Sequence, residues 1–146
     1  MNKIIEIAEK EIGYKETPDN SNMTKYGKWF GFDGVAWCAI FVSWVYEQAG
    51  ISLKNIQYPK GIAGCQSAYL YFKKNNKITD NPEPGDIVLF YWNSDGSYDH
   101  AGIFVKDISA TKFESIEGNT SINNQSNGGE VMRRIRNKKF AIFIHI

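Results

Sequence analysis

Three short segments of the sequence carry side chains that together could perform acyl transfer. A thiol, Cys38, opens an apolar run at residues 37–45, and an imidazole, His100, follows much later in the chain. A carboxylate and an amide, Glu117 and Asn119, then stand two residues apart. A cysteine nucleophile needs a base that takes its proton and a third group that orients the base. The three segments therefore predict hydrolysis of an acyl group through a thioester.

The elements expected around these residues would position them for that chemistry. Cys38 begins a helical pattern, where unpaired backbone N–H groups and the helix dipole favour a thiolate and can stabilise an oxyanion. His100 begins a predicted strand, where it could accept the thiol proton and later protonate a leaving amine. Glu117 and Asn119 are i and i+2 on one predicted strand, so both side chains are expected on the same face. Either could orient the imidazole.

Helices are predicted in the first half of the chain and strands in the second. Apolar residues near the start recur at helical spacing, and Gly13 is placed to end that helix. From residue 86 onward, β-branched and aromatic residues dominate short segments. The predicted helices cover residues 3–11, 23–30, 37–49 and 62–75, and the predicted strands cover residues 87–92, 100–106, 112–117, 130–136 and 140–146. This order predicts an α+β fold in which N-terminal helices pack on a C-terminal antiparallel β-sheet.

Composition limits the class of protein. The chain has 146 residues, of which 42% are hydrophobic, and a formal net charge of +1. This length supports one well-buried core and is too short for two ordinary domains, so we expect a single globular domain over residues 1–146. The near-neutral charge gives no reason to expect nucleic acid as a partner. The basic residues between positions 133 and 139 alternate with apolar ones, and we interpret them as a solvated strand face.

The sequence also bears on membranes and export. Its apolar stretches are all shorter than the ~20 residues that a membrane helix needs. The first residues, Met1-Asn2-Lys3, lead into a Glu-rich segment rather than a hydrophobic signal core. We therefore expect no membrane partner, no signal peptide and synthesis in the cytoplasm.

Each candidate residue also has a structural interpretation. A single Cys in an apolar helix usually belongs to the core, and a single His is usually a satisfied structural residue. Cys65 lies among small residues and is interpreted as a small buried thiol. His145, in an apolar run, is interpreted as structural. The combination of residue types, their order and their placement favours catalysis.

Four motifs together resemble the CHAP domain, a family of cysteine- and histidine-dependent amidohydrolases and peptidases of the papain-like superfamily. They are residues 37–44 (WCAIFVSW), 84–90 (PGDIVLF), 99–105 (DHAGIFV) and 116–119 (IEGN). The resemblance extends from about residue 26 to residue 136. It implies a papain-like fold with Cys38 as nucleophile, His100 as base, Glu117 as orienting group and Asn119 as a further member of the site.

The resemblance implies a hydrolase of bacterial peptidoglycan. CHAP domains mostly cleave either the N-acetylmuramoyl-L-alanine amide or a bond within the stem peptide and its cross-bridge, and many occur in phage endolysins or bacterial autolysins. An enzyme released through a holin pore, or acting from outside, would need no signal peptide. A whole endolysin usually carries a wall-binding domain, which here would belong to a longer parent protein or to a subunit acting in trans.

The resemblance implies no organic cofactor, and we expect no metal. Some CHAP domains bind calcium through an Asp-rich loop before the cysteine. The matching region here offers Asp19, Asn20, Asn22 and Asp33, which is few carboxylates for a cation that takes about 6–8 oxygen ligands. Residues 20–22 are instead expected to cap the following helix.

Aromatic residues near the site are candidates for a groove that binds a short peptide. Trp37, Trp92 and Tyr98 bracket Cys38 and His100 in the sequence, and Tyr26 lies on the other side of the cysteine. Aromatic walls bury apolar parts of a peptide and leave edges for hydrogen bonds. Trp37 could equally belong to the core, whereas Trp92 and Tyr98 flank a polar turn and are expected to be more exposed.

Other functions share parts of this pattern. A secreted effector amidase held by an immunity protein would have the same triad, and NlpC-type cysteine peptidases use similar Cys–His chemistry. A catalytically inactive wall binder should lack part of the triad. The Glu-x-Asn pair favours the CHAP family over the NlpC type.

Overall fold

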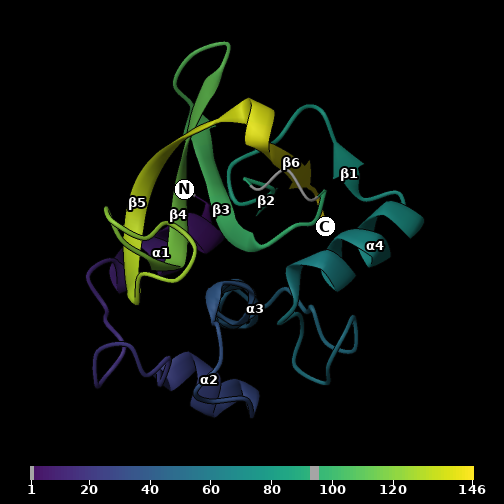
Figure 1. The fold of residues 1–146 in the computed structure, drawn as a ribbon. Helices are drawn as coiled ribbons and strands as arrows, with labels where there is room; N and C mark the ends of the chain where they lie inside the picture. Colours follow the sequence, from purple (N-terminus) through teal and green to yellow (C-terminus); the bar gives the residue numbers. More distant parts are fainter. Residues whose placement is uncertain (1, 93–95) are drawn as a thin grey trace.

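A computed structural model describes residues 2–92 and 96–146 of the chain (Figure 1). The helices are α1 (Lys3–Glu11), α2 (Lys25–Phe30), α3 (Cys38–Gln48) and α4 (Cys65–Lys74). The described strands are β1 (Ile78–Thr79), β2 (Ile87–Phe90), β3 (His100–Asp107), β4 (Lys112–Thr120), β5 (Glu130–Asn137) and β6 (Ala141–Ile144), with a short 3-10 helix, η1 (Lys138–Phe140), before β6. The predicted α+β arrangement is confirmed.

The strands form one antiparallel sheet in the order β1-β6-β2-β3-β4-β5. The ladder between β2 and β3 places Phe90 opposite His100. The next ladder places Ile103 of β3 opposite Ile116 of β4. The two strands that carry His100 and Glu117 are therefore neighbours in the sheet.

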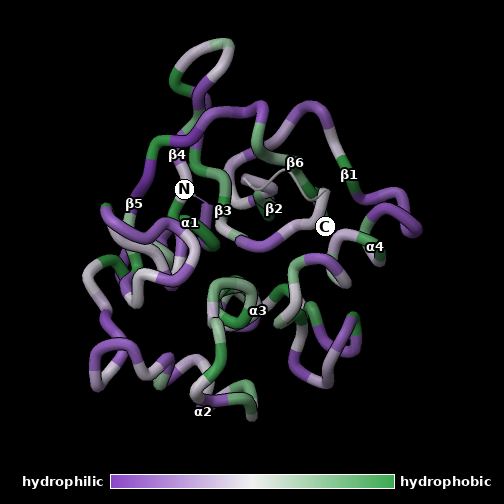
Figure 2. Tube along the Cα trace, in the orientation of Figure 1, coloured by the Kyte–Doolittle hydropathy of each residue, from purple (hydrophilic) through white to green (hydrophobic). Residues whose placement is uncertain are grey.

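Helix α3 lies at the centre of the molecule. It packs against β3 and β4 on one side and against α1 and α2 on others. Figure 2 shows the hydrophobic colour of α3 among more hydrophilic loops. A helix that is apolar nearly all round is stable only inside a core, and Cys38, its first residue, is accordingly buried.

The sheet buries apolar side chains on both faces. Side chains alternate along β2, so Ile87 and Leu89 join the large core between sheet and helices. Val88 and Phe90 join a smaller core on the other face. That smaller core consists of Val88, Phe90, Phe104, Phe113, Ala141 and Phe143, with Trp92 packed against it. Its aromatic members provide the surroundings of His100, which contacts Phe90 and Trp92.

Helix caps follow local chemistry, with one correction. Asn2 caps α1 by accepting a hydrogen bond from the Ile5 N–H at 3.2 Å. For α2, a cap within residues 20–22 was expected, but Thr24 is the N-cap and accepts from the Gly27 N–H at 2.9 Å. Asn20 and Asn22 have φ angles of 64° and 58°. Asn tolerates this left-handed conformation, so these residues form the turn before the helix.

Other differences from the predicted elements are short. The strand predicted over residues 87–92 ends at Phe90, the helix predicted from residue 62 begins at Cys65, and β4 extends to Thr120. Strand β1 has two residues, too few for a readable alternation. The turn expected at residues 93–97 falls partly on residues 93–95, which lie outside the described residues.

His145 has a polar partner that the sequence did not indicate. Its Nδ1 lies 2.7 Å from Oδ1 of Asp86, a residue 59 positions away in the sequence.

Within the described ranges, none of the helices has the length and apolar character required to cross a bilayer.

Candidate active site

Two helices begin at cysteines whose sulfur atoms face each other. Cys38 starts α3 and Cys65 starts α4, and their buried Sγ atoms are 3.9 Å apart. The N-cap residues, Trp37 and Gly64, make no side-chain hydrogen bond to their helices. Unpaired N–H groups and the positive ends of two helix dipoles therefore lie next to this pair of sulfurs, where they favour negative charge.

His100 and Glu117 lie on neighbouring strands and are both fully buried. His100 Nε2 is 2.9 Å from Glu117 Oε1. The other ring nitrogen, Nδ1, is buried and has no hydrogen-bond partner among the described residues. Cys38 interacts electrostatically with the same imidazole. Glu117 thus occupies one nitrogen and leaves Nδ1 for the thiol.

The pKa values of the two thiols and the imidazole are shifted in different directions. A hydrogen bond from the Cys65 thiol lowers the pKa of Cys38 well below its usual value; burial opposes this shift, and the charge of His100 adds to it. The same contact with Cys38, together with burial, raises the pKa of Cys65 well above its usual value. For His100, burial disfavours the charged ring, but the negative charge and proximity of Cys38 and the hydrogen bond to Glu117 outweigh it and raise the pKa to about 9. These shifts favour the thiolate form of Cys38 beside the imidazolium form of His100.

The Glu117 carboxylate is fixed by further donors. Arg136 of β5 donates from Nε to Oε2 at 2.8 Å and from Nη2 to Oε1 at 2.6 Å. Ser115 Oγ also donates to Oε2. Burial by itself would raise the pKa of Glu117, but the bonds from Arg136 and His100 and their charges outweigh it and lower the pKa to about 2. Glu117 is therefore ionised and held toward the imidazole.

Trp92 covers this network of charges. Its ring stacks on His100 with centroids 5.2 Å apart and on Phe90 at 4.8 Å. The guanidinium carbon of Arg136 lies 4.6 Å from the centroid of the Trp92 ring, a distance at which the ring face attracts the cation. A partly buried indole in this position excludes water from the His100–Glu117 pair, which strengthens their hydrogen bond.

Asn119 reaches a different part of the molecule. The ladder between β4 and β5 shifts register between Glu117 and Thr120, and Asn119 has a φ of 58°. Its Oδ1 accepts from the Gly129 N–H at 3.0 Å, and its Nδ2 donates to Asn127 Oδ1 at 3.1 Å. The expectation of a regular strand through Asn119 was wrong because of this bulge. Glu117 contacts the imidazole, whereas Asn119 anchors the following loop.

The order and setting of these residues agree with a family match. The sequence matches the model of the CHAP domain over residues 30–119, which is more than half of the chain and includes Cys38, His100, Glu117 and Asn119. The chain belongs to the CHAP domain family.

Two solved structures are similar in fold to this CHAP domain. The wild-type endolysin LysIME-EF1 aligns with a TM-score of 0.57 and 14% identity, over 99% of this chain and 63% of that one. An N-acetylmuramoyl-L-alanine amidase from Staphylococcus aureus aligns with a TM-score of 0.53 and 14% identity, over 77% of this chain and 31% of that one. The chain thus spans less than two thirds of either protein. No curated protein matches its sequence.

Two aromatic residues predicted to wall a groove belong to the core of the CHAP domain instead. Trp37 and Tyr26 are both 0% exposed, and their rings stack with centroids 5.5 Å apart. Trp37 Nε1 donates to Glu16 Oε1 at 3.0 Å, and the Tyr26 hydroxyl donates to Glu11 Oε1 at 2.8 Å. The predicted substrate contact was wrong for both, because large rings are stable inside a core once their polar atoms have partners.

An apolar groove of about 420 Å³ is lined by residues that closely precede the two cysteines. Its lining consists of Phe32, Val35, Ala36, Tyr58, Ala63 and Gly64. Gln57 Oε1 accepts from the Ala63 and Gly64 N–H groups at 2.8 and 2.9 Å and so fixes one wall.

Tyr98 is partly exposed and stacks on Tyr69 of α4, with ring centroids 4.2 Å apart. The prediction that Tyr98 and Trp92 contact substrate stays a prediction.

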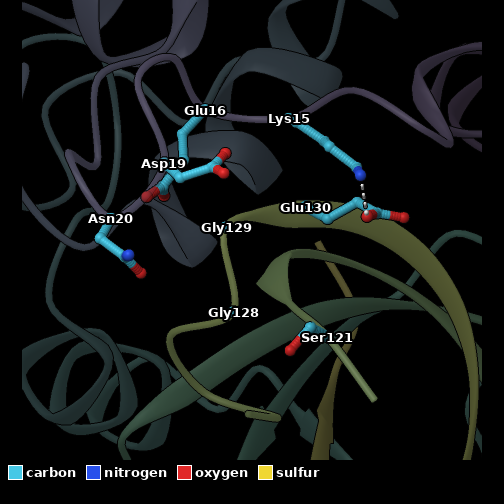
Figure 3. Close-up of a pocket in the computed structure, with 8 residues that line it drawn as sticks. All are labelled: Lys15, Glu16, Asp19, Asn20, Ser121, Gly128, Gly129 and Glu130. Atoms are coloured by element: carbon cyan, nitrogen blue, oxygen red, sulfur yellow. Dashed lines mark ion pairs between the residues drawn. The ribbon is translucent and has the colours of Figure 1, made fainter. Parts of the chain in front are cut away.

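A polar pocket of about 320 Å³ lies between residues 15–20 and the segment 121–130 (Figure 3). In it, Lys15 forms an ion pair with Glu130 at 3.6 Å. Asp33, named with Asp19 as a calcium candidate, instead accepts hydrogen bonds from the Thr24 and Gly34 N–H groups. In the described part of the chain, no group of three or more His, Cys, Asp or Glu side chains is arranged to hold a metal ion.

Two residues of the site were missed by sequence reasoning. Arg136 was assigned to a solvated basic face, yet it is buried against Glu117. The alternation along β5 separates Arg134 and Arg136 from Arg133, but it does not show which face is covered. Cys65 was interpreted as a small buried thiol and is buried, but its 3.9 Å contact with Cys38 Sγ, made where α4 begins near the start of α3, was not predicted.

Proposed function

We propose that the chain is a peptidoglycan hydrolase that cleaves an amide bond of the bacterial cell wall by way of Cys38. The observation that carries this proposal is the His100 ring, held by Glu117 at Nε2 with its buried Nδ1 left for the thiol. Membership of the CHAP family supports the reaction class. The fold shared with an endolysin and an amidase supports the substrate class.

In the first half of the reaction, the Cys38 thiolate attacks the carbonyl carbon of the amide. The oxyanion that forms is stabilised by unpaired N–H groups at the start of α3. His100 then gives the proton on Nδ1 to the leaving nitrogen, the C–N bond breaks and a thioester with Cys38 remains.

In the second half, neutral His100 takes a proton from water, and the resulting hydroxide attacks the thioester carbon. The C–S bond breaks, which releases the carboxylic acid and restores the thiolate and the imidazolium. Glu117 stabilises the imidazolium in both halves and keeps the ring in place.

We also propose that residues 1–146 form one catalytic domain of a phage-type lysin that acts at the cell wall after release through a holin pore or from outside. Binding to the wall would then involve a further domain or a subunit in trans. The similarity to an endolysin that is longer than this chain supports this arrangement.

Digestion of purified peptidoglycan tests the proposal and identifies the bond. We expect soluble fragments, which mass spectrometry resolves. A new N-terminal L-alanine means an amidase, and a new D-alanine carboxylate means an endopeptidase. Cys38→Ser should lower the rate on the order of 10³-fold or more while it keeps the fold, because the site activates a thiolate and not a hydroxyl. A folded Cys38→Ser protein that acts at the parent rate would falsify the mechanism.

A secreted effector amidase would share this chemistry, and two further observations separate it from a lysin. An effector should be toxic when it is directed to the periplasm, and it should copurify with an inhibitor protein. The NlpC-type alternative is set aside by the family match.

A further inference from the structure

Arg136 is the one buried Lys or Arg among the described residues, with 7% of its surface exposed. A guanidinium is costly to bury unless it is paired and fully hydrogen-bonded. Arg136 meets this condition with both oxygens of Glu117, to which it donates from Nε and Nη2. Nη1 donates to Gln125 Oε1 at 3.2 Å, and Nη2 also lies 3.4 Å from Thr120 Oγ1.

The fork of Arg136 matches the plane of the carboxylate. Oε1 of Glu117 accepts from both His100 and Arg136, and Oε2 accepts from Arg136 and Ser115. A planar guanidinium that binds both oxygens fixes the rotation of the carboxylate, which a single ammonium donor does not. Arg136 therefore fixes the orientation of the Glu117 carboxylate toward Nε2 of His100.

We propose that Arg136 is a positioning residue of the active site, which holds Glu117 as the acceptor for the Nε2–H of His100 and so keeps Nδ1 available to Cys38. This inference rests on the proposed function of Cys38 and His100. Arg136 would not touch the substrate. It would act on His100 through Glu117.

The charges around Glu117 alternate in sign. His100 approaches from β3 and Arg136 from β5, Arg134 of β5 interacts with Glu117 at longer range, and Cys38 of α3 interacts with His100. Without Arg136, the buried carboxylate would retain one charged hydrogen-bonding partner, His100, and would compete for its proton. A neutral imidazole would stabilise the Cys38 thiolate less.

The pH dependence of Cys38 alkylation by iodoacetamide tests the proposal without a wall substrate. The modified residue is located by mass spectrometry. Removing the positive charge in Arg136→Gln should move the acid limb of the alkylation rate upward by about one pH unit. It should also lower kcat/KM on peptidoglycan roughly 10- to 100-fold, by analogy with groups that orient metal ligands. Arg136→Lys should keep the acid limb near the parent's but still lose activity, because its ammonium cannot bind both oxygens.

Arg133→Gln is the matched control. Arg133 lies on the same strand and forms ion pairs with Glu9 and Glu114, so its loss should leave the alkylation profile unchanged. A second comparison places Arg136→Met in a Glu117→Gln background. If Arg136 acts through Glu117, the added change should lower kcat/KM by no more than about twofold to threefold, a non-additive result.

The outcomes separate this inference from the proposed function. A parent protein whose Cys38 alkylates only at alkaline pH contradicts the proposed function itself. A parent with a reactive Cys38 and an Arg136→Gln variant with the same acid limb contradict the role of Arg136. The role of Arg136 is also contradicted if Arg136→Met lowers kcat/KM by the same factor in the parent and in the Glu117→Gln background. If Arg136→Gln does not fold, Arg136→Lys and the double variant decide the matter.

Discussion

Glu117 and Asn119 stand two residues apart, yet their side chains contact different groups. Glu117→Gln keeps the size of the side chain and an oxygen for His100, but it removes the charge that stabilises the imidazolium and pairs with Arg136. Asn119→Ala removes the bonds to Gly129 and Asn127 that anchor the loop. We expect Glu117→Gln to lower kcat more, and Asn119→Ala mainly to increase proteolysis within residues 121–129. Steady-state kinetics and limited proteolysis measure the two effects.

The opposite order of kcat losses would have a definite meaning. It would make Asn119 the group that orients the base, and the contact between Glu117 and Nε2 would then be structural.

The Cys65 side chain places a thiol beside Cys38 Sγ, and this thiol can be removed with little change in volume. Cys65→Ala deletes the donor to Cys38, whereas Cys65→Ser keeps a donor of similar size. The acid limb of Cys38 alkylation should therefore move to higher pH in Cys65→Ala and stay closer to the parent's in Cys65→Ser, which should keep activity. If the pH profile of Cys38 alkylation is the same as the parent's in both variants, Cys65 has no effect on the Cys38 thiol and serves only in the core.

At the scale of the elements, the pairing of β3 with β4 leaves room for Glu117 at Gly102. A Cβ at position 102 would lie 2.7 Å from Glu117 Cγ and 3.3 Å from the Ile116 carbonyl oxygen. The constraint is steric, because Gly102 does not have a positive φ. Gly102→Ala should displace Glu117 from His100, lower kcat roughly tenfold or more and destabilise the fold by about 1–3 kcal/mol. Kinetics and thermal unfolding measure these effects, and parent kinetics in a folded variant would contradict the account.

The elements themselves could largely be predicted from the sequence. Each predicted element rests on a pattern within a short stretch of sequence, and such local patterns indicate helix or strand without knowledge of distant contacts. Examples are the helical spacing before Gly13, the apolar run after Cys38 and the β-branched segments from residue 87 onward. Caps and bulges depend on single backbone conformations. Thr24 rather than Asn22 caps α2, and the left-handed φ of Asn119 accompanies a bulge within β4, where its sequence neighbours predict a regular strand.

The cysteine and the histidine that the structure brings together could be named from the sequence, but the residues that contact them from other elements could not. Arg136 and Cys65 contact the site from other elements, and no spacing along the chain reveals such contacts. Trp37 failed as a groove residue for a similar reason. Its burial depends on Glu16, which accepts the indole N–H from 21 residues away.

At the scale of the whole molecule, folding is linked to the proton on Glu117. Its pKa is lowered from 4.5 to about 2 in the folded protein. A lowered pKa contributes stability that is fully present above pH 4.5 and is lost as the pH falls through about 2. At 1.36 kcal/mol per unit, the contribution is on the order of 3 kcal/mol. Urea unfolding between pH 2 and pH 6 should show a steeper loss for the parent than for Glu117→Gln, and parallel curves would contradict this linkage.

Because Trp92 stacks on His100 with centroids 5.2 Å apart, we expect the fluorescence of Trp92 to report the protonation state of His100. A positively charged imidazole withdraws electron density from an excited indole and quenches its fluorescence more than a neutral ring does. The pKa of His100 is raised to about 9, so emission should rise as the pH passes through that value. A Trp92→Phe variant retains Trp29, Trp37 and Trp44 and should lack the rise. The difference between the two titration curves would then report the proton on His100 in the resting protein.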